Sequence, residues 1–257
     1  METQLPKNLG DRVAVVTGAS SGIGEATAKA LAARGARVAV LARRKERLDG
    51  LVAEIHRVGG RAAAWTLDVT DRRAVEAVAA TILSEFGRVD IVVNNAGVML
   101  PNPIEAIRAD QWQKQIDLNI SGLMNVIGAF TPALIKAGAG GGPADLVNIS
   151  SIAGRNIFPS FAVYSGTKAF VTHLSITLRA ELGAKGVRVS AVEPGVVGTE
   201  LLNHVDCKGV QDWFEASKSH MEWLRSEDVA ETIAFIVSAP RRVNLQLVTI
   251  MPTGQAM

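Results

Sequence analysis

The residues best suited to chemistry in this sequence are a tyrosine and a lysine four positions apart. Tyr164 is the only tyrosine among 257 residues, and Lys168 follows it in a segment of helical character. Residues four apart share one face of a helix. A free phenol has a pKa of about 10, and a nearby ammonium favours the phenolate and lowers that value. The pair is therefore predicted to give a proton to a carbonyl oxygen and to take one in the reverse reaction.

A serine hydroxyl stands thirteen residues before this tyrosine, at the end of a predicted strand. Ser151 could donate a hydrogen bond to a developing alkoxide, the electrostatic role of an oxyanion-hole donor. Ser150 is chemically identical, so the residues alone leave the choice between them open. The four histidines have no metal-ligand spacing, and no metal site is predicted.

A glycine-rich loop near the amino terminus has the composition of a phosphate-binding site. The loop follows an apolar strand at residues 13–16 and leads directly into a helix. Glycine lets a diphosphate approach the main chain, and the following helix offers unpaired N–H groups and the positive end of its dipole. The residues expected to bind the cofactor here are Gly18, Ser20, Ser21, Gly22, Ile23 and Gly24.

The end of the second predicted strand indicates which nicotinamide cofactor is bound. NAD-preferring folds carry an acidic residue there, which binds the ribose hydroxyls. This chain has Ala42 instead, followed by Arg43 and Arg44. A guanidinium pairs with a phosphate, which a carboxylate would repel. NADP(H) is therefore predicted, with Arg43 as the principal contact; the alternative, stronger for Arg44, is that both arginines only cover the start of a helix.

The elements that must position these residues alternate along the whole chain. Strands are predicted at 13–16, 38–41, 62–67, 89–93, 145–149, 187–192 and 245–250, and helices at 25–34, 45–58, 72–86, 110–136 and 161–185. Continuous apolar strands alternating with helices predict an α/β, doubly wound Rossmann fold with a seven-stranded parallel sheet covered on both faces. Residues 1–257 are expected to form one domain, with a small helical lid at about 200–228.

Composition limits the remaining classes of function. The net charge of +2 comes from 27 basic and 25 acidic residues without a basic block, so no nucleic-acid partner is predicted. No uncharged apolar run of about 18 residues is seen, and no membrane span is expected. Cys207 is the only cysteine, and the first twelve residues lack the apolar core of a signal peptide. A cytoplasmic location is expected.

Together these motifs resemble the short-chain dehydrogenase/reductase superfamily, in its single-domain form of about 250 residues. The loop spacing T-G-x-x-x-G-x-G matches the family, as do Asn94-Asn95-Ala96-Gly97, Asn119, Ser151, Tyr164 with Lys168, and Pro194-Gly195 with Thr199. The resemblance implies a catalytic set of Asn119, Ser151, Tyr164 and Lys168, and it selects Ser151 over Ser150. It also implies further cofactor contacts from Asp68, Val69, Asn95, Ala96, Gly97, Pro194, Gly195, Val197 and Thr199, besides Tyr164 and Lys168 themselves.

The carboxyl-terminal segment and the predicted pocket indicate the kind of substrate. Residues 248–255, with 193–201, resemble the branch that contains NADP-dependent 3-hydroxy acid dehydrogenases of the serine type and clavulanate dehydrogenase. A small carbonyl or alcohol substrate is expected, with a 3-hydroxyacyl or β-dicarbonyl compound favoured. Arg155 and His204 are candidate partners for a substrate carboxylate. The predicted apolar lining is Val98, Met99, Ile157, Phe158, Val196, Leu201 and Trp213.

Two alternative functions are also considered, and the expected oligomeric state follows from the resemblance. An acyl-carrier-protein or CoA-linked 3-ketoacyl reductase would use the same chemistry. A non-catalytic NADP-binding regulatory protein would be expected to lack the tyrosine or the lysine, and this chain retains both. The resemblance implies a homo-oligomer, a tetramer or a dimer, that assembles through the helices predicted at 110–136 and 161–185.

Overall fold

The computed structural model describes residues 8–256 of the chain. Residues 1–7 and 257 lie outside it. Most of the amino-terminal stretch in which no signal peptide was predicted therefore falls outside the described residues.

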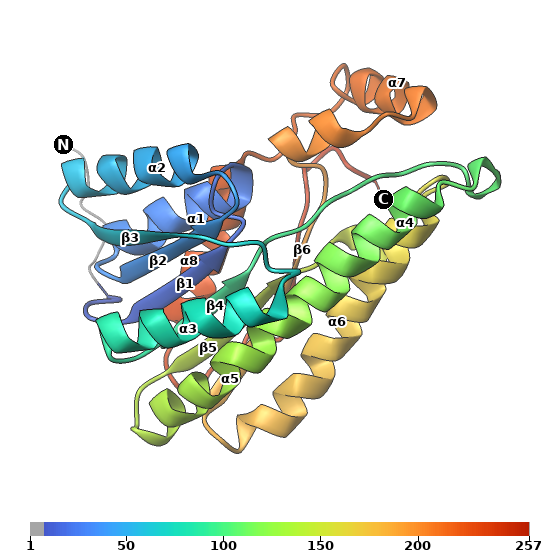
Figure 1. Cartoon of the computed structure of the whole chain (residues 1–257). Coiled ribbons are helices and arrows are strands. Elements are labelled where there is room, and N and C mark those ends of the chain that lie inside the picture. Colours follow the sequence, from blue (N-terminus) through green and yellow to red (C-terminus); the bar gives the residue numbers. More distant parts are fainter. Residues whose placement is uncertain (1–7, 257) are drawn as a thin grey trace.

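One parallel sheet of seven strands forms the centre of the molecule (Figure 1). Its order is β3-β2-β1-β4-β5-β6-β7, so the chain reverses direction across the sheet between β1 and β4. Such a reversal opens a crevice at the carboxyl ends of the strands. The predicted doubly wound fold is confirmed. The strands are β1 Val13–Thr17, β2 Arg37–Ala42, β3 Arg61–Thr66, β4 Ile91–Asn94, β5 Ala144–Ile149, β6 Val187–Pro194 and β7 Leu247–Ile250.

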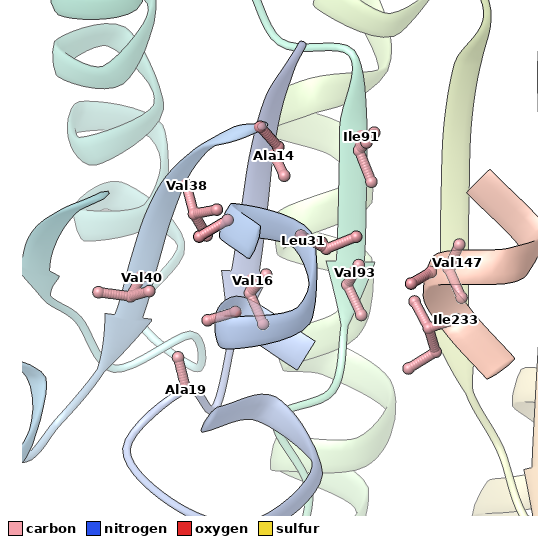
Figure 2. Packing of buried hydrophobic residues seen from close by; sticks show 14 of the residues in the cluster. Ala14, Val16, Ala19, Leu31, Val38, Val40, Ile91, Val93, Val147 and Ile233 are labelled. Carbon is pink, nitrogen blue, oxygen red and sulfur yellow. The ribbon is translucent and has the colours of Figure 1, made fainter. Parts of the chain in front are cut away.

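Helices cover both faces of this sheet, because successive residues of each strand point to opposite sides. In β1, Ala14 and Val16 belong to the core cluster on the side of α1, α2 and α8. Figure 2 shows Leu31 of α1 on this side of the sheet, and Ile233 of α8 beside Val147 of β5. Val13 and Val15 pack on the other face with α3, α5 and α6. The helices are α1 Gly22–Ala33, α2 Lys45–Arg57, α3 Arg72–Phe86, α4 Ala109–Ile116, α5 Leu123–Ala139, α6 Ala162–Gly183, α7 Lys208–Ser217 and α8 Ser226–Ser238.

Several predicted boundaries were wrong in ways that matter for the site. Helix α1 begins at Gly22, not at residue 25, so its first turn is part of the glycine-rich loop. The long helix predicted at 110–136 is interrupted by a π-helical turn, Asp117–Gly122, and continues to Ala139. The predicted lid included 226–228, which are the first turn of α8. We therefore define the lid segment as residues 200–225; it contains α7, which projects at the top of Figure 1.

The stretch Ala109–Ala139 needs comment, because no membrane span was predicted. Among the described residues it is the one helical stretch that is long and apolar enough to cross a bilayer by length and composition. Its side chains Val126, Phe130 and Leu134 are nevertheless buried in the core beside β1 and β5. It is therefore used as a core helix.

A buried ionic network lies at the amino-terminal ends of β1, β5 and β6, opposite the crevice. Asp145, at the start of β5, accepts hydrogen bonds from Arg12 and from Arg188 Nε and Nη2, the latter two at 2.7 and 2.8 Å. The two guanidiniums also donate to carbonyl oxygens at the end of α8 and just after it, including those of Val237 and Ala239. All three charged side chains are at least nine-tenths buried. One carboxylate therefore joins β1, β5, β6 and the end of α8.

We expect Asp145→Asn to destabilise the fold by about 3–5 kcal/mol, because the change leaves two buried guanidiniums without a counter-ion. The free energy of unfolding in urea measures the effect. Asp212→Asn is the matched control, since Asp212 forms an exposed ion pair with Lys208 in α7, and its loss should cost less than about 1 kcal/mol. Equal losses in the two variants would contradict the role assigned to Asp145.

Candidate active site

The crevice begins where the loop after β1 meets the turn after β4. Thr17 Oγ1 accepts hydrogen bonds from the backbone N–H groups of Asn95 (3.0 Å) and Ala96 (3.1 Å). The Asn95 amide donates in return to the carbonyl oxygens of Thr17 and Gly18. Gly18 has a φ of +64°, and a Cβ on Gly24 would lie 2.4 Å from the Gly18 oxygen. Glycine is therefore required at both positions for this close approach.

One elongated pocket extends from this junction along the carboxyl ends of the strands. The predicted cofactor residues line it except for Gly24, which packs behind the loop. Asn94 lies outside it, and its side-chain amide donates to Asn148 Oδ1 of β5 at 2.9 Å, which joins β4 and β5. The lining residues from the prediction are Gly18, Ser20, Ser21, Gly22, Ile23, Arg43, Arg44, Asp68, Val69, Asn95, Ala96, Gly97, Tyr164, Lys168, Pro194, Gly195, Val197 and Thr199.

At one end of the pocket the two arginines differ in their contacts. The Arg44 guanidinium donates to Ser20 Oγ (3.1 Å), Ser21 Oγ (2.8 Å) and the Ser20 carbonyl oxygen (3.3 Å). The Arg43 side chain is 75% exposed, and its Nη1 lies 3.9 Å from Asp68 Oδ2. The alternative that Arg44 only covers the start of α2 is therefore wrong, because Arg44 is bound to the glycine-rich loop. Asp68 does not cap the neighbouring helix α3, because Asp71 is the N-cap residue of that helix.

At the other end, the tyrosine and lysine on α6 meet the end of β5. Tyr164 and Lys168 are each 7% exposed, and Lys168 Nζ lies 5.7 Å from the centre of the phenol ring. Lys168 Nζ donates to the carbonyl oxygen of Ile149 at 2.9 Å. The Ser151 and Tyr164 side chains share a hydrogen bond. This arrangement places a hydroxyl, a phenol and an amine around one point of the pocket.

Burial dominates the ionisation of this pair. Desolvation raises the pKa of Tyr164 to about 12, although the hydrogen bond with Ser151 opposes the rise. Desolvation lowers the pKa of Lys168 to about 8. The lowering expected from the nearby ammonium is not seen in the protein alone, because burial disfavours the phenolate and the net shift of the tyrosine pKa is upward. The phenol holds its proton at neutral pH.

Ser150 lies at the pocket wall, and its hydroxyl belongs to a buried hydrogen-bond chain. Its hydroxyl is bonded to the Lys168 carbonyl oxygen (2.9 Å) and to Thr172 Oγ1 (2.8 Å). Thr172 donates to Glu193 Oε1 at 2.9 Å. Glu193 is fully buried in β6 and also accepts from Thr249 and pairs with Arg155. Through this carboxylate, α6, β6, β7 and the turn after Ser151 are held together.

Asn119 lies within the π-helical turn and does not line the pocket. Its Oδ1 accepts from the Val98 N–H at 2.8 Å, and its Nδ2 donates to the Val98 carbonyl oxygen (2.9 Å) and to Thr167 Oγ1 (3.1 Å). A Cβ on Gly97 would lie 3.3 Å from Asn119 Oδ1 and 3.8 Å from Lys168 Nζ. Asn119 is therefore one layer behind the pocket wall, next to the lysine. Single π turns inside α-helices are frequent at functional sites.

The predicted substrate region is apolar in most of its lining, with two corrections. Ile157 is 93% exposed and lies outside the pocket. Arg155 is bound to Glu193 and Thr249, so it does not point a free charge at the substrate. Phe161, which the sequence prediction missed, packs edge-to-face on Tyr164 with ring centres 6.3 Å apart. The predicted residues that do line the pocket are Val98, Met99, Phe158, Val196, Leu201, His204 and Trp213.

Two carboxylates, also missed from the sequence, attach the lid segment to the rest of the site. Glu200 accepts from Arg44 Nη1 at 2.8 Å. Asp206 accepts from the side-chain amides of Asn102 (3.2 Å) and Gln111 (2.8 Å) and from Arg108 (3.2 Å). Hydrogen bonds from these neighbours lower the pKa of Asp206. The only sequence signal for either was that Glu200 directly follows Thr199 in a matched motif.

The chain is similar to known proteins over nearly its whole length. A family model described as short chain dehydrogenase matches residues 12–208. Sulfoacetaldehyde reductase 2 of Chromohalobacter salexigens is 40% identical over 246 residues, 95% of each chain. Serine 3-dehydrogenase of Agrobacterium fabrum is 36% identical over 243 residues, 94% of each. Glycine betaine reductase ATRR of Emericella nidulans is 39% identical over 253 residues, which are 98% of this chain but only 19% of that longer protein.

Solved structures agree with this similarity. The closed form of a serine dehydrogenase complexed with NADP+ has a TM-score of 0.85 and 33% identity, covering 95% of this chain and 96% of that one. A metagenomic short-chain oxidoreductase in complex with NADP has a TM-score of 0.80 and 32% identity, covering 96% and 99%.

The lowered pKa of Lys168 predicts a pH-dependent stability. Between its pKa of about 8 in the folded protein and the ordinary value of 10.5, the unfolded chain binds more protons, so stability rises with pH. Relative to Lys168→Met, which has no charge to desolvate, the wild type should gain about 2 kcal/mol between pH 7 and 9.5. Urea unfolding at four pH values measures this difference, and parallel curves for the two proteins would show that Lys168 is not desolvated.

Proposed function

The chain belongs to the short chain dehydrogenase family and is an oxidoreductase, and we propose that it interconverts a ketone or aldehyde with an alcohol by hydride transfer to or from NADP(H). The observation that carries the proposal is the buried Tyr164 between Ser151 and Lys168, at one end of a pocket whose other end carries Arg43 and Arg44. The NADP-bound structural neighbours support the same cofactor.

The residues present fit a dinucleotide phosphate. Gly18 and Gly22 have positive φ angles, and a side chain at either would be strained and would narrow the crevice. Two hydroxyls, of Ser20 and Ser21, and the Arg44 guanidinium gather at one end, and no carboxylate occupies position 42. Ser20, Ser21, Arg43 and Arg44 would hold the 2′-phosphate end, and Lys168 the nicotinamide ribose. When bound, the cofactor supplies or accepts the hydride.

The protonation state of Tyr164 suits the reducing direction. A phenol with a pKa of about 12 retains its proton near neutrality and can pass that proton to a carbonyl oxygen as negative charge develops there. Ser151, already hydrogen-bonded to the phenol, would donate to the same oxygen. Lys168, with a pKa of about 8, would carry a proton close to the working pH, and Asn119 would fix the backbone of residues 97–98 beside it.

We infer that the substrate is small, with a 3-oxo or 3-hydroxy acid favoured. The pocket around Tyr164 is mostly apolar and is closed by aromatic residues of α7 and the turn before α6. His204 is the lining side chain that would pair with a carboxylate or sulfonate. Serine 3-dehydrogenase and sulfoacetaldehyde reductase, to which the chain is similar, are named for small substrates. A carrier-linked 3-ketoacyl substrate is the alternative.

Loss of the phenol tests the chemistry. In a screen of β-keto acids, β-keto esters, aldehydes and diketones, Tyr164→Phe should lower the rate of NADPH oxidation by about 10²–10⁴-fold. NADPH binding, followed by the nucleotide's fluorescence, should change little. Full activity in this variant would overturn the mechanism. Binding of NADPH by the wild type without oxidation of any compound in the panel would favour a regulatory NADP-binding protein.

A matched pair of serine variants tests which hydroxyl acts on the substrate. Ser151→Ala should lower kcat by about 10²–10³-fold, the usual effect of losing an oxyanion donor. Ser150→Ala removes a buried bond to Thr172 and should lower the stability by about 1–3 kcal/mol while kcat falls less than tenfold. Steady-state kinetics and urea unfolding of both variants separate the effects. The reverse pattern would assign the role to Ser150.

A further inference from the structure

Glu200 forms an ion pair with the guanidinium of Arg44, on which the proposed cofactor site depends. It is the first residue of the lid segment and lies in the short helix Glu200–His204. Its Oε2 accepts from Arg44 Nη1 at 2.8 Å, and its Oε1 accepts from Arg47 Nη2 at 3.4 Å. The hydrogen bond from Arg44, the charges of Arg44 and Arg47 and a hydrogen bond from Ser21 together lower the pKa of Glu200. A carboxylate anion is therefore bound at the Ser21–Arg44 end of the pocket.

Arg44 has little capacity left for a second anion. A guanidinium has five N–H donors, and four of those on Arg44 are directed at Ser20 Oγ, the Ser20 carbonyl oxygen, Ser21 Oγ and Glu200. A phosphate bound at Ser20 and Arg44 would thus need donors already in use. It would also place two negative charges beside a third at Glu200, and like charges that share one cation repel each other.

We propose that Glu200 is an internal counter-ion of Arg44 that the 2′-phosphate of the cofactor displaces, and that Glu200 thereby sets the preference for phosphorylated over unphosphorylated nucleotide. This inference rests on the proposed NADP(H) function. Displacement also releases the first turn of the lid segment from the glycine-rich loop, while Asp206 keeps its own bonds to Asn102, Arg108 and Gln111. Phosphate binding and release of residues 200–204 are therefore coupled, and the coupling is reciprocal.

Two nucleotides that differ only in the 2′-phosphate isolate the effect. Adenosine 2′,5′-bisphosphate and adenosine 5′-monophosphate are titrated into the full-length protein by calorimetry. Because the Arg44–Glu200 pair is half-exposed, Glu200→Gln should tighten the Kd of the bisphosphate by about two- to fivefold and leave that of the monophosphate unchanged. Glu215→Gln is the matched control, since Glu215 is a carboxylate of the same lid segment that pairs with Lys218 in the lid itself.

Each outcome is decisive. An unchanged bisphosphate Kd in Glu200→Gln would overturn the inference. Weaker binding of both nucleotides would also overturn it, because Glu200 would then support nucleotide binding instead of opposing it. If the wild-type protein bound the two nucleotides with the same Kd, the proposal that NADP(H) is the cofactor would instead be overturned. Hydrogen–deuterium exchange tests the coupling: the bisphosphate should speed exchange of residues 200–204 in the wild type but not in Glu200→Gln. Slower exchange in the wild type would exclude displacement.

Discussion

The close contact between the loop after β1 and the turn after β4 is the constraint on which the rest of the site depends. The strand order reverses there, so helices leave β1 and β4 on opposite faces and the carboxyl ends of the two strands are left uncovered. The backbone must pass close to Asn95 without a side chain at Gly18 or Gly24. Thr17 and Asn95 then fix the two segments with reciprocal hydrogen bonds. An open crevice is thus held by rigid backbone.

The reacting end of the crevice is held differently, by a buried carboxylate. Glu193 gathers hydrogen bonds from Thr172 and Thr249 and an ion pair from Arg155. These contacts come from α6, from β7 and from the turn that follows Ser151. Ser150 continues the chain of bonds to the backbone of Lys168. The Glu193 side chain therefore links the positions of Ser151, Tyr164 and Lys168. Such a buried polar network favours one geometry over close alternatives.

Local patterns predicted the strands, the order of the motifs and the Tyr164–Lys168 face, because these depend on residues near one another in sequence. The contacts of Arg44 with Ser20 and Glu200 span 24 and 156 residues, and no local pattern encodes them. Ile157 was predicted to line the pocket because it is apolar, yet the turn carries it into solvent. Glu193 appeared to be only part of a matched motif, since its burial depends on three other elements.

The wrong expectation about the tyrosine pKa also clarifies how the pair works. Two effects compete at Tyr164: desolvation disfavours the phenolate, and the hydrogen bond with Ser151 favours it. In the protein alone desolvation dominates for both side chains, so Tyr164 is held neutral and the cationic form of Lys168 is weakened. In the proposed reduction, the buried phenol would thus be ready to donate its proton. Alcohol oxidation, the reverse of the proposed reaction, would instead need the phenolate, and burial opposes its formation.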